Sequence, residues 1–238
     1  MKNISDRKRI VVKVGTSTLT HRTGMLNIRR VEQLVKTLAD IQNSGHEVIL
    51  VSSGAIGLGM GKLGLRERPK DTPGKQACAA VGQCELMYLY DNLFAEYSIT
   101  VAQMLLTKYI LLEDRRKNVE NAMERLIAHG VIPIINENDT VAIDELELEV
   151  GENDSLAATV AAIAKADLLI IMSDIDGLYD KDPHTYDDAR LIPVVHEITD
   201  DIRALAGGAG TKLGTGGMIT KLNAVEIAYD SDIDVVLM

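Results

Sequence analysis

The sequence predicts an α/β protein with a mainly parallel central sheet covered by helices on both faces, and two patterns indicate it. Short β-rich runs alternate with helical patterns along the chain, which is the order of a parallel sheet. Several of these runs are apolar on both faces, as the central strands of such a sheet are. The 238 residues are 46% hydrophobic, which suffices to bury the core of one large domain.

The elements are expected in a regular order. Strands are predicted at 9–15, 46–52, 98–106, 131–135, 167–172 and 233–238, and helices at 27–44, 114–129 and 219–230. Gly45 and Gly130 each stand between a helix and a strand, where a left-handed helix cap is favoured. Residues 140–154 include an alternating pattern that predicts a β-hairpin, which we interpret as a flap over the site. Residues 207–218 contain six glycines and predict a flexible loop.

Composition excludes several classes of function. The chain has 25 Lys and Arg against 35 Asp and Glu, and its net charge of -10 repels a phosphate backbone. Aromatic content of 3% provides no stacking platform for bases, so nucleic acid is not an expected partner. Cys78 and Cys84 lie in a helical pattern without metal-ligand spacing, and the histidines are scattered, so we expect reduced structural thiols and no metal cluster. Without a membrane-spanning run or a signal-peptide core, a cytoplasmic protein is expected.

In open parallel sheets ligands bind beyond the carboxyl ends of the strands, which is where the unusual residues of this chain fall. The first strand ends in KVGTS at 13–17, where Lys13 can reach phosphates that the Gly15 backbone approaches closely. A solvated surface lysine is the alternative interpretation. The second strand leads into SSGAIGLGMGKLG at 52–64, whose first residues start a helix that favours an anion.

Two motif matches in that segment are coincidental. GMGKLG at 59–64 matches the dinucleotide fingerprint, but Gly59 comes too late after the strand-to-helix turn. GAIGLGM at 54–60 is not a Walker A loop, because Met60 stands where lysine is required.

Four further motifs carry polar or glycine-rich chemistry. NENDTV at 136–141 and GENDSLAA at 151–158 favour ligand binding, although Asp154 with Ser155 equally fits a helix cap. SDIDGLYDKDP at 173–183 is rich in carboxylates but lacks the glycine of a calcium loop. GTGGMITK at 214–221 offers backbone N–H groups at a helix start together with a lysine, a combination suited to phosphate.

In this order the six motifs resemble those of the amino acid kinase family, in the form carried by its glutamate-phosphorylating members, over residues 13 to 221. The resemblance implies a three-layer α/β/α sandwich. One kinase domain, 1–238, would bind glutamate with its N-terminal half and ATP with its C-terminal half. KVGTS differs from the K-x-G-G form of the family's aspartate and N-acetylglutamate kinases. We expect no PUA domain, and we expect the kinase domain to lack its last strand or two.

The resemblance also implies roles for individual residues. Lys13 and Lys221 would stabilise the transferring phosphoryl group, and Asp154 would orient both lysines. Ser173 replaces the family's usual threonine and keeps the hydroxyl. Glutamate would be bound by Ser53, Gly54, Asn138, Asp139 and Asn153. ATP would be held by Lys13, Gly15, Ser173, Asp174, Thr215, Gly216, Gly217, Met218, Ile219, Thr220 and Lys221.

Physical chemistry fits these roles. A glutamate carboxylate has a pKa of about 4.3 and is ionised at neutral pH, so it needs charge neutralisation rather than a general base. Two lysines and Mg²⁺ provide that, the metal being held chiefly by phosphates and water with no protein ligand assigned. Asp139 suits the α-ammonium group, whereas an N-acetylated substrate would leave that carboxylate unpaired.

The expected partners are L-glutamate and ATP, in the first step of proline biosynthesis. The resemblance further implies feedback inhibition by proline, delivery of the product to a glutamyl-phosphate reductase, and a homo-oligomer.

Two other functions are the alternatives to glutamate phosphorylation: another kinase of the family, acting on N-acetylglutamate or aspartate, and a non-catalytic amino-acid sensor. Retention of both lysines argues against the sensor, because binding alone does not require transition-state stabilisation.

Overall fold

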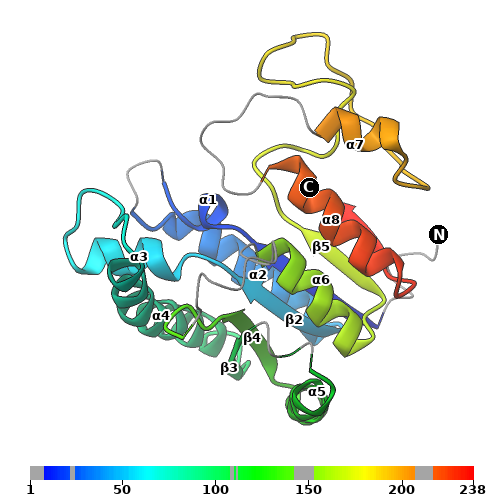
Figure 1. Ribbon diagram of the computed structural model, residues 1–238. Helices are drawn as coiled ribbons and strands as arrows, with labels where there is room; N and C mark the ends of the chain where they lie inside the picture. Colours follow the sequence, from blue (N-terminus) through cyan, green and yellow to red (C-terminus); the bar gives the residue numbers. More distant parts are fainter. Residues whose placement is uncertain (1–7, 22–24, 108–109, 111, 142–152, 207–216) are drawn as a thin grey trace.

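The computed structural model describes residues 8–21, 25–107, 110, 112–141, 153–206 and 217–238. The predicted hairpin at 140–154 and the glycine-rich loop at 207–218 lie almost entirely outside these residues. The described elements form one parallel sheet with helices on both faces (Figure 1). This confirms the predicted fold class.

The described elements follow the predicted alternation of strands and helices, with ends within a few residues of those expected. The sequence pattern does not predict α1 or α7, and it indicates α4 only around its two cysteines. The elements are β1 (Arg9–Val14), α1 (Thr16–Leu19), α2 (Ile28–Asn43), β2 (Glu47–Ser52), α3 (Ala55–Lys62), α4 (Thr72–Ala95), β3 (Val101–Leu106), α5 (Glu113–Ala128), β4 (Ile132–Glu137), α6 (Asn153–Ala164), β5 (Leu168–Ile171), α7 (Asp200–Ala206), α8 (Met218–Tyr229) and β6 (Asp234–Leu237).

The six strands are ordered β3-β4-β2-β1-β5-β6, and each described pair is parallel. β1 lies inside the sheet between β2 and β5, so that Lys13 is paired with Val51 on one side and Ile171 on the other. The chain passes from β1 to β2 in one direction and later crosses to β5 in the other. The carboxyl end of β1 therefore lies at a topological switch point, where open α/β sheets bind ligands.

Each face of the sheet has its own apolar core, because side chains alternate along a strand. Val11 and Ile135 contribute to the core beneath α5, α6 and α8. Val12 and Ile134 contribute to the opposite core, beneath α2 and α4. Figure 1 shows α6 and α8 side by side along one face. Coverage from both sides explains the runs of buried residues in β1, β2 and β4 and confirms the prediction of apolar central strands.

The helices α3 and α4 pack backbone to backbone. A Cβ added at Gly59 of α3 would lie 1.8 Å from the carbonyl oxygen of Cys78. One added at Gly82 of α4 would lie 1.7 Å from the carbonyl oxygen of Ala55. Gly59 is therefore a packing residue inside a helix, which explains why GMGKLG is not a dinucleotide fingerprint.

Two predicted glycine caps are present, and one expectation about cysteine needs correction. Gly45 and Gly130 adopt φ angles of +100° and +73° directly before the next strands, as the left-handed cap predicts.

Both cysteines are free, but only Cys78 is buried. Cys84 is exposed, because α4 turns that position outward, so the expected structural role holds for Cys78 alone.

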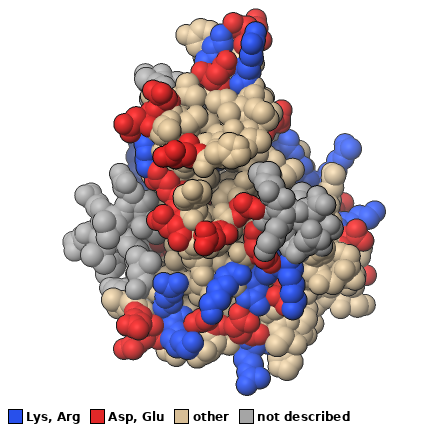
Figure 2. Space-filling view, turned by 90° about the vertical axis from the view of Figure 1, so that its right-hand side faces the viewer, with Lys and Arg blue, Asp and Glu red and all other residues tan. Residues whose placement is uncertain are grey.

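The surface agrees with the acidic composition. On the face shown in Figure 2, Lys and Arg lie interspersed with Asp and Glu rather than in one continuous basic area. Within the part of the chain that the structure describes, no helix has the length and apolar character needed to cross a membrane.

Candidate active site

Three charged side chains meet at the carboxyl end of β1. Nζ of Lys13 lies 2.6 Å from Oδ1 of Asp154, and Nζ of Lys221 lies 3.0 Å from Oδ2 of the same carboxylate. The exposed fractions of Lys13, Asp154 and Lys221 are only 7%, 2% and 8%. Lys13 is therefore not a solvated surface lysine. Asp154 holds two lysines, which a helix cap alone would not require. We refer to these three residues as the triad.

The local sequence explains how the triad assembles. Lys13 is two residues beyond Val11 on β1, so its side chain points to the face that carries α6 and α8. Asp154 lies in the first turn of α6, where the helix dipole favours a carboxylate. Lys221 lies near the start of α8, which packs along α6. The Thr220 hydroxyl donates to the carbonyl oxygen of Gly217 at 2.7 Å and so fixes the start of α8.

The triad keeps a positive charge in buried surroundings. Burial by itself raises the pKa of Asp154, but the charges and hydrogen bonds of Lys13 and Lys221 hold that pKa below its ordinary value. Asp154 is ionised and neutralises only one of its two lysines. The remaining charge suits an anion, and above all the charge that develops on a phosphoryl group during transfer.

A cluster of neutral side chains begins at the residue before Asp154. Nδ2 of Asn153 donates to Oγ of Ser53 at 2.6 Å and to Oδ1 of Asn136 at 3.2 Å. Nδ2 of Asn136 in turn donates to Oε1 of Gln83 at 2.9 Å. The structure thus brings together Ser53 and Asn153, which the sequence predicts as binding residues, and adds Asn136 and Gln83.

The motifs of the sequence do not identify the support that α4 gives to this cluster. Gln83 follows Ala79 and precedes Leu86 on the buried face of α4, but α4 has no clear amphipathic period, so the sequence does not mark that face. Two turns beyond Gln83 on that face, the Tyr90 hydroxyl is 2.9 Å from Oγ of Ser52. Burial raises the pKa of Tyr90, although its bond to Ser52 works in the opposite direction, so the hydroxyl stays protonated.

Asn138 and Asp139 lie in the turn after β4 and are half-buried. Burial raises the pKa of Asp139, while the positive charge of Arg68 works in the opposite direction. A partly buried carboxylate of this kind gains from a cationic ligand. Oδ1 of Asn138 accepts a hydrogen bond from the Thr140 hydroxyl at 2.6 Å. The described hydrogen bonds of these residues do not reach the triad.

The residues predicted to hold ATP come from three segments. A Cβ added at Gly15 would lie 3.5 Å from Nζ of Lys13, so the backbone there runs close to the triad. Ser173 and Asp174 follow β5, the strand next to β1, and the Ser173 hydroxyl donates to Asp174 at 3.3 Å. Gly217 caps α8, whose first residues are Met218, Ile219, Thr220 and Lys221. Thr215 and Gly216 lie outside the described residues.

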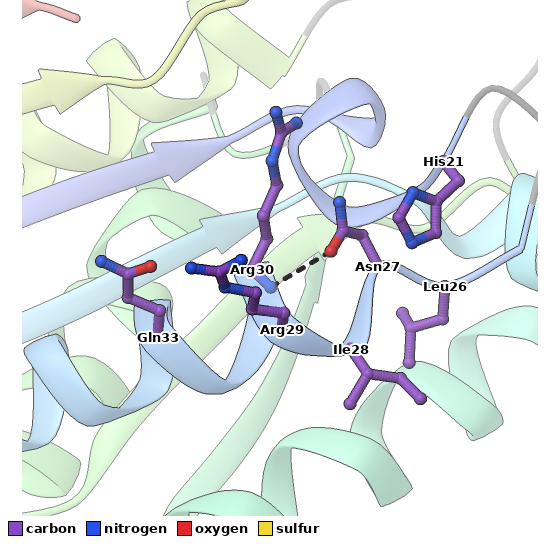
Figure 3. A pocket seen from close by; sticks show the side chains of 7 residues that line it. All are labelled: His21, Leu26, Asn27, Ile28, Arg29, Arg30 and Gln33. Carbon is purple, nitrogen blue, oxygen red and sulfur yellow. Dashed lines mark hydrogen bonds between the residues drawn. The ribbon is translucent and has the colours of Figure 1, made fainter.

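An open pocket of about 490 Å³ lies at a different place, the N-terminal end of α2 (Figure 3). Asn27 caps this helix by accepting a hydrogen bond from the backbone of Arg30. No predicted site residue lines the pocket, so the candidate active site is the strand-end cluster rather than this cavity. The lining residues are His21, Leu26, Asn27, Ile28, Arg29, Arg30 and Gln33.

The fold and the site define an α/β protein of the phosphoryl-transfer class, with its charged groups at the carboxyl end of a parallel sheet. The model that describes the amino acid kinase family matches residues 8–238. The chain belongs to the amino acid kinase family.

Several relatives match almost the whole chain. A glutamate 5-kinase of Clostridium perfringens is 53% identical over 99% of this chain and 89% of its own length. One of Lactococcus lactis subsp. lactis is 49% identical over 99% of this chain and 88% of its own length. One of Caldanaerobacter subterraneus is 55% identical over 96% of this chain, and the match spans 61% of that longer protein.

Solved structures share the fold at low identity. A UMP kinase from Ureaplasma parvum aligns with a TM-score of 0.61 at 16% identity, over 98% of this chain and 89% of its own. The UMP kinase of Bacillus anthracis aligns with a TM-score of 0.52 at 16% identity, over 78% of this chain and 72% of its own. These likenesses bear on the fold alone.

Proposed function

We propose that this chain transfers the γ-phosphoryl group of ATP to the side-chain carboxylate of L-glutamate, giving L-glutamyl 5-phosphate in the first step of proline biosynthesis. The observation that carries the proposal is the buried triad of Lys13, Asp154 and Lys221. Relatives about half identical to the chain are glutamate 5-kinases, which supports the same reaction.

The triad supplies what this reaction lacks in water. The attacking carboxylate is already ionised at neutral pH, because its reference pKa is about 4.3, but it is repelled by the triphosphate. Lys13 and Lys221 would offset that repulsion and stabilise the equatorial oxygens of the phosphoryl group in the transition state. Asp154 would hold both ammonium groups in place, so that no reorganisation is needed during transfer.

Glutamate would bind in the N-terminal half, against the neutral cluster. Ser53 and Asn153 lie next to the triad, and Gly54 adopts a φ of +106° at the start of α3, where the backbone can approach a ligand closely. Asp139 would take the α-ammonium group, with Asn138 in the same turn. An N-acetylated substrate would leave the Asp139 carboxylate without a cation, which favours free glutamate over N-acetylglutamate.

ATP would bind in the C-terminal half, between the segment after β5 and the start of α8. Ser173 and Asp174 would contact the nucleotide, and the segment from Thr215 to Lys221 would hold its phosphates, with the Gly15 backbone on the other side. Among the described residues, no three His, Cys, Asp or Glu side chains are placed to hold a metal ion, and Asp154 is occupied by its lysines. A Mg²⁺ ion held chiefly by phosphates and water would neutralise phosphate charge when bound.

The proposal extends to partners. Glutamyl 5-phosphate is a labile acyl phosphate, so a reductase that consumes it would be a natural partner. Proline would act as a feedback inhibitor, and the enzyme would work as a homo-oligomer.

A hydroxylamine-trapping assay for acyl phosphate tests the proposal. We expect ATP- and Mg²⁺-dependent hydroxamate formation with glutamate and background signal with N-acetylglutamate and aspartate. Lys13→Ala is the matched negative control, because it removes one ammonium group of the triad. Signal with N-acetylglutamate or aspartate would instead assign the chain to another kinase of the family. Tight glutamate binding without any signal would favour an amino-acid sensor.

A further inference from the structure

We propose that Gln83 is a positioning residue. It determines which atoms at the glutamate-binding end of the site are hydrogen-bond donors and which are acceptors. This inference rests on the proposed function. Gln83 belongs to α4, is 8% exposed and acts through Asn136 and Asn153 rather than by contact with substrate. Neither the motifs of the sequence nor the expected site residues include it.

The helix that carries Gln83 is held rigidly. Its neighbour Gly82 lies against the backbone of Ala55, where a Cβ would come within 1.7 Å of the carbonyl oxygen. On the same face, Leu86 and Tyr90 are fully buried. A side chain at position 83 is therefore placed accurately by the packing around it.

Strand alternation directs two strand ends toward α4. Ser52 is two residues beyond Leu50 on β2, and Asn136 is two residues beyond Ile134 on the neighbouring β4. Leu50 and Ile134 belong to the core beneath α4, so Ser52 and Asn136 face that helix. α4 meets them with Tyr90 and Gln83 respectively. The helix thus braces both strand ends that lead into the neutral cluster.

Donor and acceptor counts show what Gln83 determines. Oε1 of Gln83 accepts from Nδ2 of Asn136, which turns Oδ1 of Asn136 toward Asn153. Both N–H groups of the Asn153 amide are then used, one for Asn136 and one for Ser53. Counting the hydrogen bonds among the described residues, the carbonyl oxygen of Asn153 and the hydroxyl hydrogen of Ser53 are left for a ligand. An acceptor and a donor side by side match the ammonium and carboxylate groups of a free amino acid.

The free-energy cost of burying the Gln83 amide also indicates a functional role. Among the described residues, Nε2 of Gln83 is buried without a hydrogen-bond partner, although most buried amide groups in proteins are paired. A methionine of similar size would fill the same space without that penalty, but it would take the acceptor away from Nδ2 of the buried Asn136. Without the Gln83 acceptor, however, the Asn136 amide can turn over and exchange its oxygen and nitrogen. Asn153 is then no longer held with its carbonyl oxygen toward the ligand.

The test compares Gln83→Met with the wild-type enzyme, measuring kcat, both KM values and the urea unfolding midpoint. We expect the glutamate KM to rise about tenfold, with ATP KM and the unfolding midpoint near wild type. Gln83→Glu keeps an acceptor oxygen in either protonation state, so its glutamate KM should lie closer to wild type. A glutamate KM within twofold of wild type in Gln83→Met, or an equal rise in both KM values, would overturn the proposal.

Gln42→Met is the matched control. Gln42 accepts from the backbone of Val48 and donates to Gly130, at the opposite end of the sheet, so its loss should lower the unfolding midpoint and leave the glutamate KM unchanged. Action through Asn136 is tested by adding Gln83→Met to Asn136→Ala. The added substitution should change the glutamate KM by less than twofold. If the double variant instead shows the product of the two single-variant changes in KM, Gln83 does not act through Asn136.

A failure of the proposed function is distinguishable from a failure of this inference. If the wild-type protein forms no acyl phosphate from glutamate, the proposed function fails, and calorimetric glutamate binding decides the role of Gln83. A Kd about tenfold weaker in Gln83→Met, with unchanged nucleotide binding, supports the positioning role. Equal glutamate affinities, or no glutamate binding by either protein, overturn it.

Discussion

The two ends of the candidate site are adjacent in sequence and opposite in chemistry. Asn153 joins a network of neutral amides and hydroxyls, whereas the next residue, Asp154, joins two buried lysines. Neutral groups hold a ligand by geometry, and concentrated charge acts most strongly where charge develops during the reaction. The comparison teaches that one helix start, that of α6, places a neutral network and a charged cluster on consecutive residues, and the proposed function assigns ground-state binding to the first and transition-state stabilisation to the second.

The two carboxylates of the site differ in the same way. The pKa of Asp154 is held below its ordinary value by two lysines, in spite of burial. The pKa of Asp139 is raised by burial, with Arg68 opposing the change. Asp154 has its cations within the protein, whereas the cation proposed for Asp139 is the ammonium group of the ligand.

The largest expected effect is that of Asp154→Ala, which leaves two lysines buried without their carboxylate. Removing one partner of a buried ion pair costs roughly 3–5 kcal/mol, so we expect a loss of stability of that order. We expect kcat to fall by at least a hundredfold as well, because neither lysine is held in place. Urea denaturation and the hydroxamate assay measure the two effects. A stable, active Asp154→Ala protein would contradict the assigned role of the triad.

Acid unfolding sharpens this prediction. A carboxylate whose pKa is lowered on folding adds stability above its unfolded pKa of about 4, and that stability is lost as pH falls through the lower folded pKa. The wild-type protein should therefore lose more unfolding free energy than Asp154→Ala between about pH 5 and acid pH. If the unfolding free energies of the two proteins change equally with pH, folding does not lower the pKa of Asp154.

The next effect concerns Lys221, at the charged end. Lys221→Ala should lower kcat about a hundredfold, corresponding to about 3 kcal/mol, with little change in the glutamate KM. Lys62→Ala is a suitable control, because Lys62 is an exposed lysine paired with Glu85 on the surface. A change confined to KM would assign Lys221 to ground-state binding instead.

A smaller effect tests the scaffold beneath the neutral end. Gly59→Ala should destabilise the protein by about 1–3 kcal/mol, because the added Cβ meets the Cys78 carbonyl at 1.8 Å. Gly61→Ala is the matched control in the same helix, where nothing lies within 4 Å of the added Cβ and helix propensity improves. Equal stabilities for the two variants would show that α3 and α4 do not pack as described.

The smallest expected effect is that of Asp139→Asn, which should raise the glutamate KM about tenfold and leave the ATP KM unchanged. Since folding raises the pKa of Asp139, its favourable contribution to stability is present below the unfolded pKa of about 4 and is lost as pH rises through the folded pKa. The substitution should therefore stabilise the ligand-free protein at pH 7 but not at acid pH. Unchanged glutamate KM with higher stability would mean that Asp139 does not bind the ammonium group.

Much of the fold could be predicted from the sequence, because its elements carry strong local patterns. The apolar runs of β1, β2 and β4 and the caps at Gly45 and Gly130 are set by short-range rules that the structure confirms. α4 is harder to predict, because it is apolar around most of its circumference and shows no clear amphipathic period.

The site could be predicted only where glycine, lysine and Asn-Asp motifs mark strand ends. Lys13 and Lys221 are 208 positions apart, and only the fold brings both to Asp154. Gln83 and Tyr90 stand in an ordinary helical stretch, and their contacts depend on how α4 lies against β2 and β4. Such support residues have no motif, since their function depends on tertiary position alone.

The most direct test of this division of labour is a side-by-side steady-state analysis of Lys221→Ala and Gln83→Met with glutamate as the varied substrate. We predict that Lys221→Ala lowers kcat with a near-normal glutamate KM, and that Gln83→Met raises the glutamate KM with a near-normal kcat. If both variants change the same parameter, the charged and neutral ends do not have separate roles, and the central claim is wrong.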